Sequence, residues 1–433
     1  MIEIDAEQAG HGILGMPPVQ FLREYWQKKP LLVRNAFPAF ESPIQPEDLA
    51  GLACEEGALA RIVRHDHAAD TWQLETGPFP EEKFPAMPQQ DWTLLVQDVD
   101  KWDADVRALF DAFPFLPRWR MDDIMVSFAA PGGSVGAHID NYDVFLLQGV
   151  GHRRWQIDTR ANPDETYRDD VPLRLLKHFH PNHDWVLGPG DMLYIPPGVP
   201  HHGTAEDACL TISVGLRAPS SAELLEHYAD SLTFDADERI RYGDGDIAPP
   251  KDVNEIDEAA LDRALEALNR LRLSGRDELG EWFGRFISAY RVAEGQAPSP
   301  ADAAGQDIID SLKAGMAWVR HPYTRMAWRR MGDGAMLFVN GAAFPASVAD
   351  AKLIAAAEVL DGDLPAALTG KGRALLQTLA DGGHYQPDDM PDNENVVLNG
   401  AITCTDLVME KGWPQASNGG TISCSGTGWE YIK

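Results

Sequence analysis

The segment GAHIDNYDVFLLQGVGHRRWQI, residues 136–157, decides the fold of this chain because it joins polar residues to two apolar strands. His138 and Asp140 stand directly before the first apolar run, and Arg153 lies at the start of the second. Residues two apart in an extended strand point to the same side, so we expect His138 and Asp140 to face one point. Gly136 allows the backbone to bend just upstream of them. The segment therefore predicts a polar site at the mouth of a β-barrel.

A second ordered run of glycines and prolines, GPGDMLYIPPGVPHHG, occupies residues 188–203. From Gly190 to His201 the order is glycine, five residues, proline, one residue, glycine, two residues and histidine. This order resembles the second conserved motif of the cupin superfamily, in which a tight turn aims the histidine into a barrel. The first cupin motif is matched more loosely upstream, because Asp140 stands in place of its second histidine.

Two histidines and one carboxylate are the ligand set typical of non-haem iron(II) oxygenases, since three ligands leave positions open on the ion. His138, Asp140 and His201 are therefore the predicted Fe(II) ligands and the predicted catalytic centre. An H-x-D pair alone recurs by chance, and its combination with the downstream turn makes the prediction specific. The alternative is a structural polar cluster at a barrel mouth. His202 competes with His201 for the third position, and the motif spacing favours His201.

Arg153 lies in the run HRRWQID, where it shares strand parity with the apolar residues Trp155 and Ile157. An arginine on a buried face needs an anion, because burying an unpaired charge is unfavourable. A dicarboxylate co-substrate supplies one, since the planar guanidinium can pair with a carboxylate through two N–H groups. The hydroxyl of Ser127 on the neighbouring strand could add a hydrogen bond. The alternative for Arg153 is a salt bridge to one of the many acidic residues.

The 433-residue chain has 37 basic and 67 acidic residues, which gives a formal net charge of −30. Such a surface repels phosphate backbones, so direct binding to nucleic acid is not expected. It attracts cationic partners instead, and a basic protein or peptide is the more natural partner. The acidity could also serve solubility alone.

The other bulk properties predict a cytoplasmic protein that does not enter a membrane. The four cysteines are scattered without a C-x-x-C pair, which argues against a disulfide framework and a zinc ribbon. No run approaches the roughly 18 apolar residues of a membrane helix. The N-terminal MIEIDAEQAG lacks the basic and apolar regions of a secretory signal.

Changes of pattern along the chain predict five regions. Residues 1–90 form the N-terminal part of the barrel region, and short strands broken by Gly and Pro indicate a catalytic barrel over 91–218. Residues 219–297 switch to helical periodicity, with an aromatic face that suits an intersubunit core or packing on the barrel. Residues 298–385 combine helices with a hairpin and predict a winged-helix-like module. Residues 386–433 are an extension of unknown role.

Two details within the later regions can be compared with a structure. In MAWRRMGDGAMLFVNG a hairpin is expected to turn at Asp333-Gly334. Leu261, Leu265, Leu268 and Leu271 follow the spacing of one helical face.

At these residues the chain resembles the JmjC-type 2-oxoglutarate oxygenases, and specifically the bacterial ribosomal oxygenases that hydroxylate an arginine of a large-subunit ribosomal protein. The matching text is REYWQKKPLLVRNAF, VSFAAPGGSVGAHIDNYDVFLLQGVGHRRW, GDMLYIPPGVPHHG and ISVGLRAPS. It covers most of residues 15–385, in the family's order of JmjC barrel, helical dimerisation region and winged-helix-like domain.

This resemblance implies an α+β protein with a double-stranded β-helix (a cupin or JmjC jelly roll), assembled as a homodimer. By the resemblance, His138, Asp140 and His201 bind Fe(II), and Ser127 and Arg153 hold 2-oxoglutarate, with O2 as the other co-substrate. The implied reaction is hydroxylation of a basic ribosomal protein.

An acidic mouth would suit an arginyl substrate, and Asn141, Tyr142 and Asp143 are candidates for its lining. Two alternatives to this reaction stay open. Within the same chemistry, the enzyme would be a histidyl hydroxylase or a lysyl demethylase. In another class, it would be a winged-helix transcriptional regulator whose barrel senses a metal or a metabolite. The regulator draws on a basic cluster made of Arg320, Arg325, Arg329 and Arg330, and the net charge argues against it.

Overall fold

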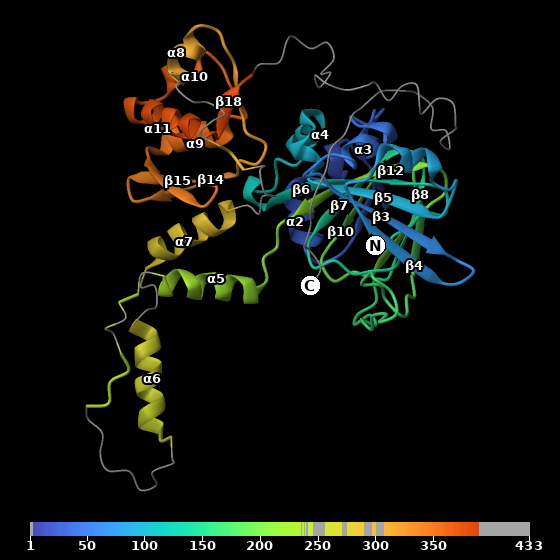
Figure 1. Cartoon of the computed structure of the whole chain (residues 1–433), viewed down its shortest axis with the longest axis horizontal. Helices are drawn as coiled ribbons and strands as arrows, with labels where there is room; N and C mark the ends of the chain where they lie inside the picture. Colours follow the sequence, from blue (N-terminus) through green and yellow to red (C-terminus); the bar gives the residue numbers. More distant parts are fainter. Residues whose placement is uncertain are drawn as a thin grey trace. The chain divides into compact units, whose positions relative to one another are not determined.

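The computed structural model describes residues 3–234, 236–237, 239, 241–245, 256–270, 275–289, 297–299 and 307–388. These residues form two compact units, the first running to Ala218 and the second beginning at Pro219. Figure 1 shows the helices and strands of both. Of the predicted extension at residues 386–433, everything from residue 389 lies outside the described residues, as does Leu271.

The first unit contains one nine-stranded sheet and one three-stranded sheet, antiparallel except where β1 pairs with β2. The large sheet has the order β1 (Glu3–Asp5), β2 (Leu31–Arg34), β10 (Met192–Ile195), β7 (Val144–Val150), β12 (Cys209–Leu216), β6 (Met121–Ala129), β5 (Trp92–Gln97), β3 (Leu59–Asp66) and β4 (Thr71–Thr76). The small sheet has the order β11 (His201–Ala205), β8 (Arg153–Ile157) and β9 (His183–Leu187). The helices are α1 (Ala6–Ala9), α2 (Pro18–Glu24), α3 (Pro46–Leu52) and α4 (Ala104–Ala108), with 3-10 turns η1 (Gly12–Leu14), η2 (Glu81–Ala86), η3 (Val99–Lys101), η4 (Leu109–Ala112) and η5 (Arg118–Arg120).

The two faces of the large sheet have different surroundings. On one face, the ring of Phe21 from α2 packs edge-on against Tyr194 of β10, with ring centroids 5.0 Å apart, in the main apolar core. On the other face, Leu146 of β7 joins Trp155 and Ile157 of β8 in a second apolar cluster. This second cluster lies between the two sheets, so they enclose a barrel interior. The predicted double-stranded β-helix is confirmed.

Strand parity carries polar residues into that interior. Along β12, Leu210, Ile212 and Val214 belong to the main core, so Thr211 between them points to the opposite face. Along β6, Val126 and its even-numbered neighbours likewise enter the core. Ser127 is buried on the face that β6 turns to the barrel interior. Strands that are covered on both faces thus keep an apolar side for stability and a partly polar side for a site.

The second unit contains seven helices and six strands within the described residues. The helices are α5 (Ser221–Thr233), α6 (Glu258–Arg270), α7 (Arg276–Ser288), α8 (Ile308–Lys313), α9 (Val348–Ala356), α10 (Leu364–Ala367) and α11 (Gly370–Asp381). The strands are β13 (Trp318–Arg320), β14 (Met326–Met331), β15 (Gly334–Val339), β16 (Ala342–Ala346), β17 (Val359–Leu360) and β18 (Tyr385–Pro387). Throughout the described ranges, no helix has both the length and the apolar character needed to cross a bilayer.

The hairpin in this unit differs from expectation by one residue. Met331 pairs with Gly334, so the two-residue turn is Gly332-Asp333 and not Asp333-Gly334. Gly332 has a φ of +55°, a left-handed conformation that favours glycine at the first turn position. The predicted position was wrong because three small or turn-forming residues follow one another, and only the pairing register selects between them.

Candidate metal and co-substrate site

His138, Asp140 and His201 converge in the first unit. Each offers one ligand atom, and these atoms lie within 4.8 Å of one another, which no other group of three described His, Cys, Asp or Glu residues achieves. The Oδ2 atom of Asp140 is 3.9 Å from Nε2 of His138 and 3.6 Å from Nε2 of His201. Such a group of two imidazoles and one carboxylate can hold a divalent transition metal.

Backbone pairing brings the two histidines together. The N–H of each donates to the carbonyl of the other, at 3.0 Å in both directions. A further bridge joins Ser134 to Thr204. Between the two bridges the upstream segment advances by four residues, from Ser134 to His138, whereas β11 advances by three, from His201 to Thr204. The extra residue makes a β-bulge at Gly136, where φ is +81°. Bulges of this kind re-aim side chains beside active sites.

The Nδ1 atoms of both imidazoles are hydrogen-bonded to backbone carbonyls. Nδ1 of His138 lies 3.0 Å from the Gly136 carbonyl, and Nδ1 of His201 lies 2.9 Å from the Val199 carbonyl. A carbonyl only accepts, so each Nδ1 carries a proton, and a neutral imidazole held in this way has its lone pair on Nε2, toward Asp140. Burial, and then the neighbouring His138, lower the pKa of His201 to about 4. His201 is therefore neutral at physiological pH, as a metal ligand must be.

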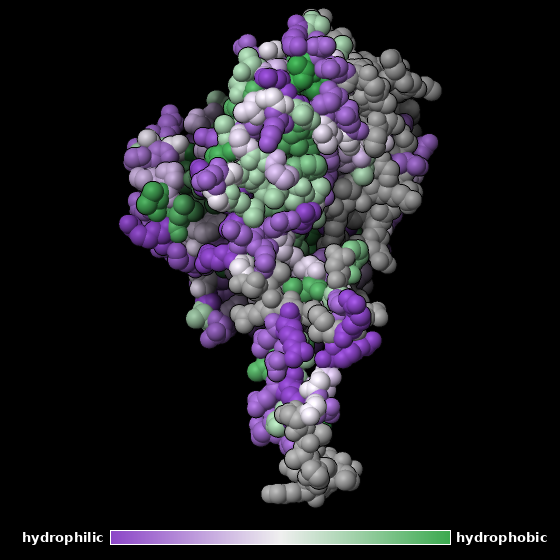
Figure 2. All heavy atoms as spheres, turned by 90° about the vertical axis from the view of Figure 1, so that its left-hand side faces the viewer, coloured by the Kyte–Doolittle hydropathy of each residue, from purple (hydrophilic) through white to green (hydrophobic). Residues whose placement is uncertain are grey.

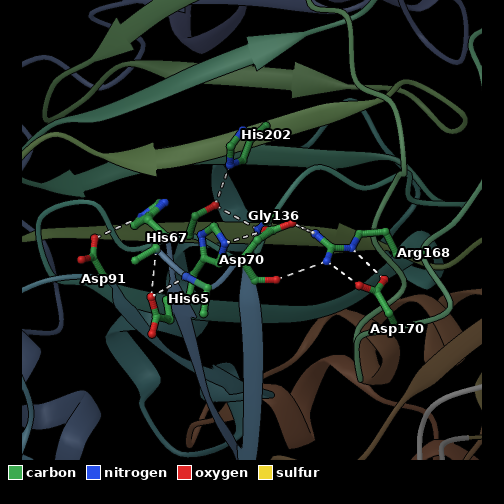
Figure 3. Close-up of polar contacts among 12 residues, drawn as sticks. His65, His67, Asp70, Asp91, Gly136, Arg168, Asp170 and His202 are labelled. Carbon is green, nitrogen blue, oxygen red and sulfur yellow. Dashed lines mark hydrogen bonds and ion pairs between the residues drawn. The ribbon is translucent and has the colours of Figure 1, made fainter.

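His202 takes no part in this group. Its side chain lies on the other face of β11, where Nε2 is 2.9 Å from the Ser134 hydroxyl oxygen (Figure 3). That oxygen also accepts the N–H of Gly136 at 3.0 Å. The contact between Ser134 and His202 therefore fastens the bulge that presents His138.

A polar rim adjoins the bulge. Arg168 donates to Asp70 at 2.9 Å and to Asp170 at 2.7 Å, and Asp70 in turn contacts His65 at 3.2 Å (Figure 3). The Leu176 N–H donates to the Ala137 carbonyl at 2.8 Å, next to His138. The sequence analysis missed this rim, because its members are too far apart along the chain to leave a local signal.

Arg153 occupies the buried face of β8. It is 3% exposed, and its Nη1 donates to the hydroxyls of Ser127 at 3.1 Å and Thr211 at 3.3 Å. Its Nε is buried without a hydrogen-bond partner, and among the described residues no carboxylate pairs with this guanidinium. Burial lowers the pKa of Arg153, though arginine remains charged. A buried cation with neutral partners alone fits an arriving carboxylate, so the salt-bridge alternative does not apply among these residues.

The ring of Trp155 lies between this cation and the histidines. The Arg153 guanidinium carbon is 5.4 Å from the Trp155 ring centroid, and the His201 ring is 6.0 Å from it. A molecule with a carboxylate at each end could therefore reach from the guanidinium toward the His-Asp-His group.

An acidic group occupies another part of the same interior face. Asp123 shares parity with Ser127 along β6, and its site is left open by Gly215, where a Cβ would come 2.8 Å from the Asp123 carboxyl. Burial, and then the charge of Asp98, raise the pKa of Asp123 to about 8. The negative charge of Asp140, and after it that of Asp123, raise the pKa of the Tyr142 hydroxyl, although Tyr142 is 45% exposed. Tyr142 is therefore within electrostatic range of both the His-Asp-His group and Asp123.

The expectation that Asp143 lines the mouth is wrong. Asp143 is fully buried and accepts hydrogen bonds from the Tyr194 hydroxyl at 2.6 Å, from Gln27 at 2.9 Å and from Arg120 at 3.2 Å. It belongs to the packing of α2 against the sheet. The alternation of side chains at the start of β7 sends it to the face opposite the site.

Comparisons with known proteins agree with this architecture. Residues 108–224 match the JmjC domain model, and residues 265–386 match the ROXA-like winged helix. The ribosomal protein uL16 3-hydroxylase of Escherichia coli is 37% identical over 74% of this chain and 83% of its own length. A probable ribosomal oxygenase of Haemophilus influenzae is 43% identical over 48% of this chain and 52% of its own.

Solved structures agree as well. The X-ray structure of E. coli YcfD has a TM-score of 0.76 and 33% identity, covering 87% of this chain and 99% of that one. A structure of YcfD, a ribosomal oxygenase, in complex with cobalt and 2-oxoglutarate has a TM-score of 0.73 over the same shares. By sequence and by fold, this chain belongs to the JmjC-domain ribosomal oxygenases.

Proposed function

We propose that this chain is an Fe(II)- and 2-oxoglutarate-dependent protein hydroxylase that acts in the cytoplasm on an arginine of a large-subunit ribosomal protein. The observation that carries the proposal is the convergence of His138, Asp140 and His201 in the same barrel interior as a buried Arg153 with no anion. The named activity of the E. coli relative, 3-hydroxylation of ribosomal protein uL16, supports the substrate class.

In this proposal His138, Asp140 and His201 are the iron ligands. Both imidazoles direct Nε2 toward Asp140, and three ligands leave the remaining positions for co-substrates. When bound, Fe(II) supplies the chemistry that couples oxidative decarboxylation of 2-oxoglutarate to insertion of an oxygen atom into a substrate C–H bond. The chain's own part is to hold the ion in one geometry and to orient both organic molecules around it.

Arg153 and Ser127 are the proposed partners of the distal carboxylate of 2-oxoglutarate. The guanidinium supplies charge and paired N–H groups, and the serine hydroxyl lies 3.1 Å from it. Trp155 fills the wall between this end and His201, which leaves the oxoacid end of the molecule at the iron ligands.

Asp123 is the proposed partner of the substrate guanidinium. Asp123 accepts a long hydrogen bond, 3.5 Å, from the Asp98 N–H, and the Lys101 ammonium forms ion pairs with Asp98 and Asp100. The pKa of this carboxyl is raised by burial and by like charges, so an arriving cation would strongly stabilise its ionised form. Tyr142, which is 45% exposed, would flank the aliphatic part of the substrate side chain.

We also propose that the protein is a homodimer formed by helices of the second unit. On α6, Leu261, Leu265 and Leu268 are 53%, 59% and 71% exposed, and none of the residues of this helix is buried. Figure 2 shows mostly hydrophilic side chains on the face of α6 turned to the viewer, as in an amphipathic helix. The aromatic face of α7 is partly satisfied within the unit, because Trp282 packs on Tyr228 of α5 with ring centroids 5.2 Å apart.

The first prediction concerns the bulge. Gly136→Ala places a Cβ 2.8 Å from the Leu175 methyls and 3.1 Å from Trp72, so His138 must shift and metal affinity should fall about tenfold or more. Gly10→Ala is the matched control, because its φ of +68° brings a similar backbone strain while no atom lies within 4 Å of the added Cβ. Titration with Co(II), followed by visible absorption, measures both affinities. Equal losses in the two variants would contradict the role given to the bulge.

The second prediction concerns activity. Purified protein with Fe(II), ascorbate and 2-oxoglutarate should convert the co-substrate to succinate when given an arginine-containing ribosomal peptide, and the peptide should gain one oxygen atom. Asp140→Ala should abolish both products, because it removes an iron ligand. Tandem mass spectrometry locates the oxygen, so a hydroxylated histidine or a demethylated lysine would redirect the proposal within the same chemistry. Absence of turnover with every ribosomal protein would remove it.

The third prediction concerns substrate charge. Asp123→Asn keeps the shape of the side chain and removes the carboxylate that can form when the cation arrives, so kcat/KM for the arginyl peptide should fall roughly 10–100-fold, a loss of about 1.5–3 kcal/mol. The dissociation constant for 2-oxoglutarate should not change. Asp122→Asn is the control, since it removes the neighbouring acidic charge one residue earlier on β6. A similar loss in both variants would show that general acidity, and not Asp123, attracts the peptide.

The fourth prediction concerns assembly. Multi-angle light scattering should give the mass of a dimer, and Leu265→Glu should give a monomer that keeps its helical circular dichroism. Arg270→Glu, on the opposite side of α6, changes the charge by two units, against one for Leu265→Glu, and should still leave the dimer intact. A monomeric unaltered protein would refute this part of the proposal.

A further inference from the structure

The buried guanidinium of Arg153 is held by neutral groups that lie beyond the residues proposed to touch 2-oxoglutarate. We propose that Gln148 and Thr211 form a hydrogen-bond relay with a single direction, which keeps Arg153 charged and oriented before the co-substrate arrives. Both are positioning residues, because they act through Arg153. The inference rests on the proposed function and adds to it the reason why an empty co-substrate pocket tolerates a buried cation.

Gln148 of β7, which is completely buried, fixes the donor-to-acceptor direction of the relay. Its Nε2 donates to the Val150 carbonyl at 2.8 Å and to the Leu210 carbonyl at 3.2 Å. Carbonyls only accept, so both hydrogens of the amide are committed and the amide can have only this orientation. Its Oε1 must then face the other way and act as an acceptor.

The Thr211 hydroxyl links Gln148 to Arg153. It donates to Oε1 of Gln148 at 3.1 Å, which uses the only proton that a hydroxyl has. Toward Arg153 it can therefore only accept, and it does so from Nη1 at 3.3 Å. The relay thus ends in a fixed lone pair aimed at a cation, and the same hydroxyl has no proton left for a carboxylate.

Ser127 differs from Thr211 in this respect. Its oxygen accepts from Nη1 of Arg153 at 3.1 Å, and its proton points to the Thr211 carbonyl over a long 3.5 Å. That weak contact leaves the serine proton free to turn to an arriving carboxylate. The two hydroxyls on one guanidinium therefore divide the work: Ser127 can bind the co-substrate, and Thr211 holds the arginine.

The relay is built into strand register. Thr211 stands opposite Ser127 on one neighbouring strand and opposite Gln148 on the other. Between Leu210 and Thr211 the pairing with β7 shifts by one residue, a bulge at Gly149, and this shift presents the Val150 and Leu210 carbonyls to the amide. The polar chain is thus fixed by backbone hydrogen bonds at one end and by Arg153 at the other.

The relay should affect binding and not chemistry. A guanidinium oriented in advance loses less rotational freedom when the carboxylate arrives, so removing the relay weakens co-substrate binding. Thr211→Val has the same shape without the hydroxyl, and we expect the dissociation constant for 2-oxoglutarate to rise about tenfold. Thr211→Ser restores a hydroxyl and should bind almost as the unaltered protein does. At saturating 2-oxoglutarate, kcat should be the same in all three.

The test measures binding of 2-oxoglutarate and of 2-oxobutyrate, which has no distal carboxylate, to protein loaded with Mn(II), by calorimetry. Thr211→Val should weaken 2-oxoglutarate and leave 2-oxobutyrate unchanged, because Arg153 contacts only the distal group. The melting temperature of each variant separates this effect from a loss of folding. Gln148→Leu should not add to the effect of Thr211→Val, since the two residues form one chain.

Unchanged 2-oxoglutarate binding by Thr211→Val would overturn the relay, and so would an equal loss for both oxoacids. Failure of the unaltered protein to bind either oxoacid is a different result, since it would remove the proposed function itself together with the purpose of the relay.

Discussion

The mutual backbone hydrogen bonds between His138 and His201 are the constraint on which the site depends. They hold the imidazole of His138 beside that of His201 at the start of β11. Asp140 lies two residues after His138, so its side chain points to the same side. The bulge at Gly136 makes this pairing compatible with the neighbouring bridge at Ser134. A site built in this way is as rigid as the sheet, which suits a metal that tolerates little change in ligand geometry.

The interior face of β6 also separates the two organic ligands by charge. Ser127, near the buried Arg153, and Asp123, near Tyr142, lie four residues apart on the same face of one strand. A dianion is attracted to the first position, whereas a cationic side chain is repelled from the first and stabilised at the second by the carboxylate that its arrival allows to form. The proposed co-substrate and substrate therefore cannot exchange places.

Buried polar groups in this barrel are satisfied by networks with a defined direction. The Ser134 hydroxyl, which accepts from the Gly136 N–H and contacts His202, stabilises the bulge, and the Thr211 hydroxyl, which accepts from Arg153 and donates to Gln148, stabilises a cation. The Thr211 hydroxyl has its single proton committed on one side, which fixes what it can do on the other. Side chains that contact neither metal nor substrate thereby determine the orientation of those that do.

The sequence by itself determined the family, the barrel fold and the residues of the His-Asp-His group, because these depend on local spacing. The turn before His201 and the parity of Arg153 with Trp155 leave a signal within a few residues. Tertiary structure alone decided which acids face the site. Asp143 is buried against α2 while Asp123 lies in the interior, and no local pattern distinguishes them, since each is one acid near a strand end. The relay through Gln148 and Thr211 was equally invisible, because its members meet only through the register of strands far apart in the chain.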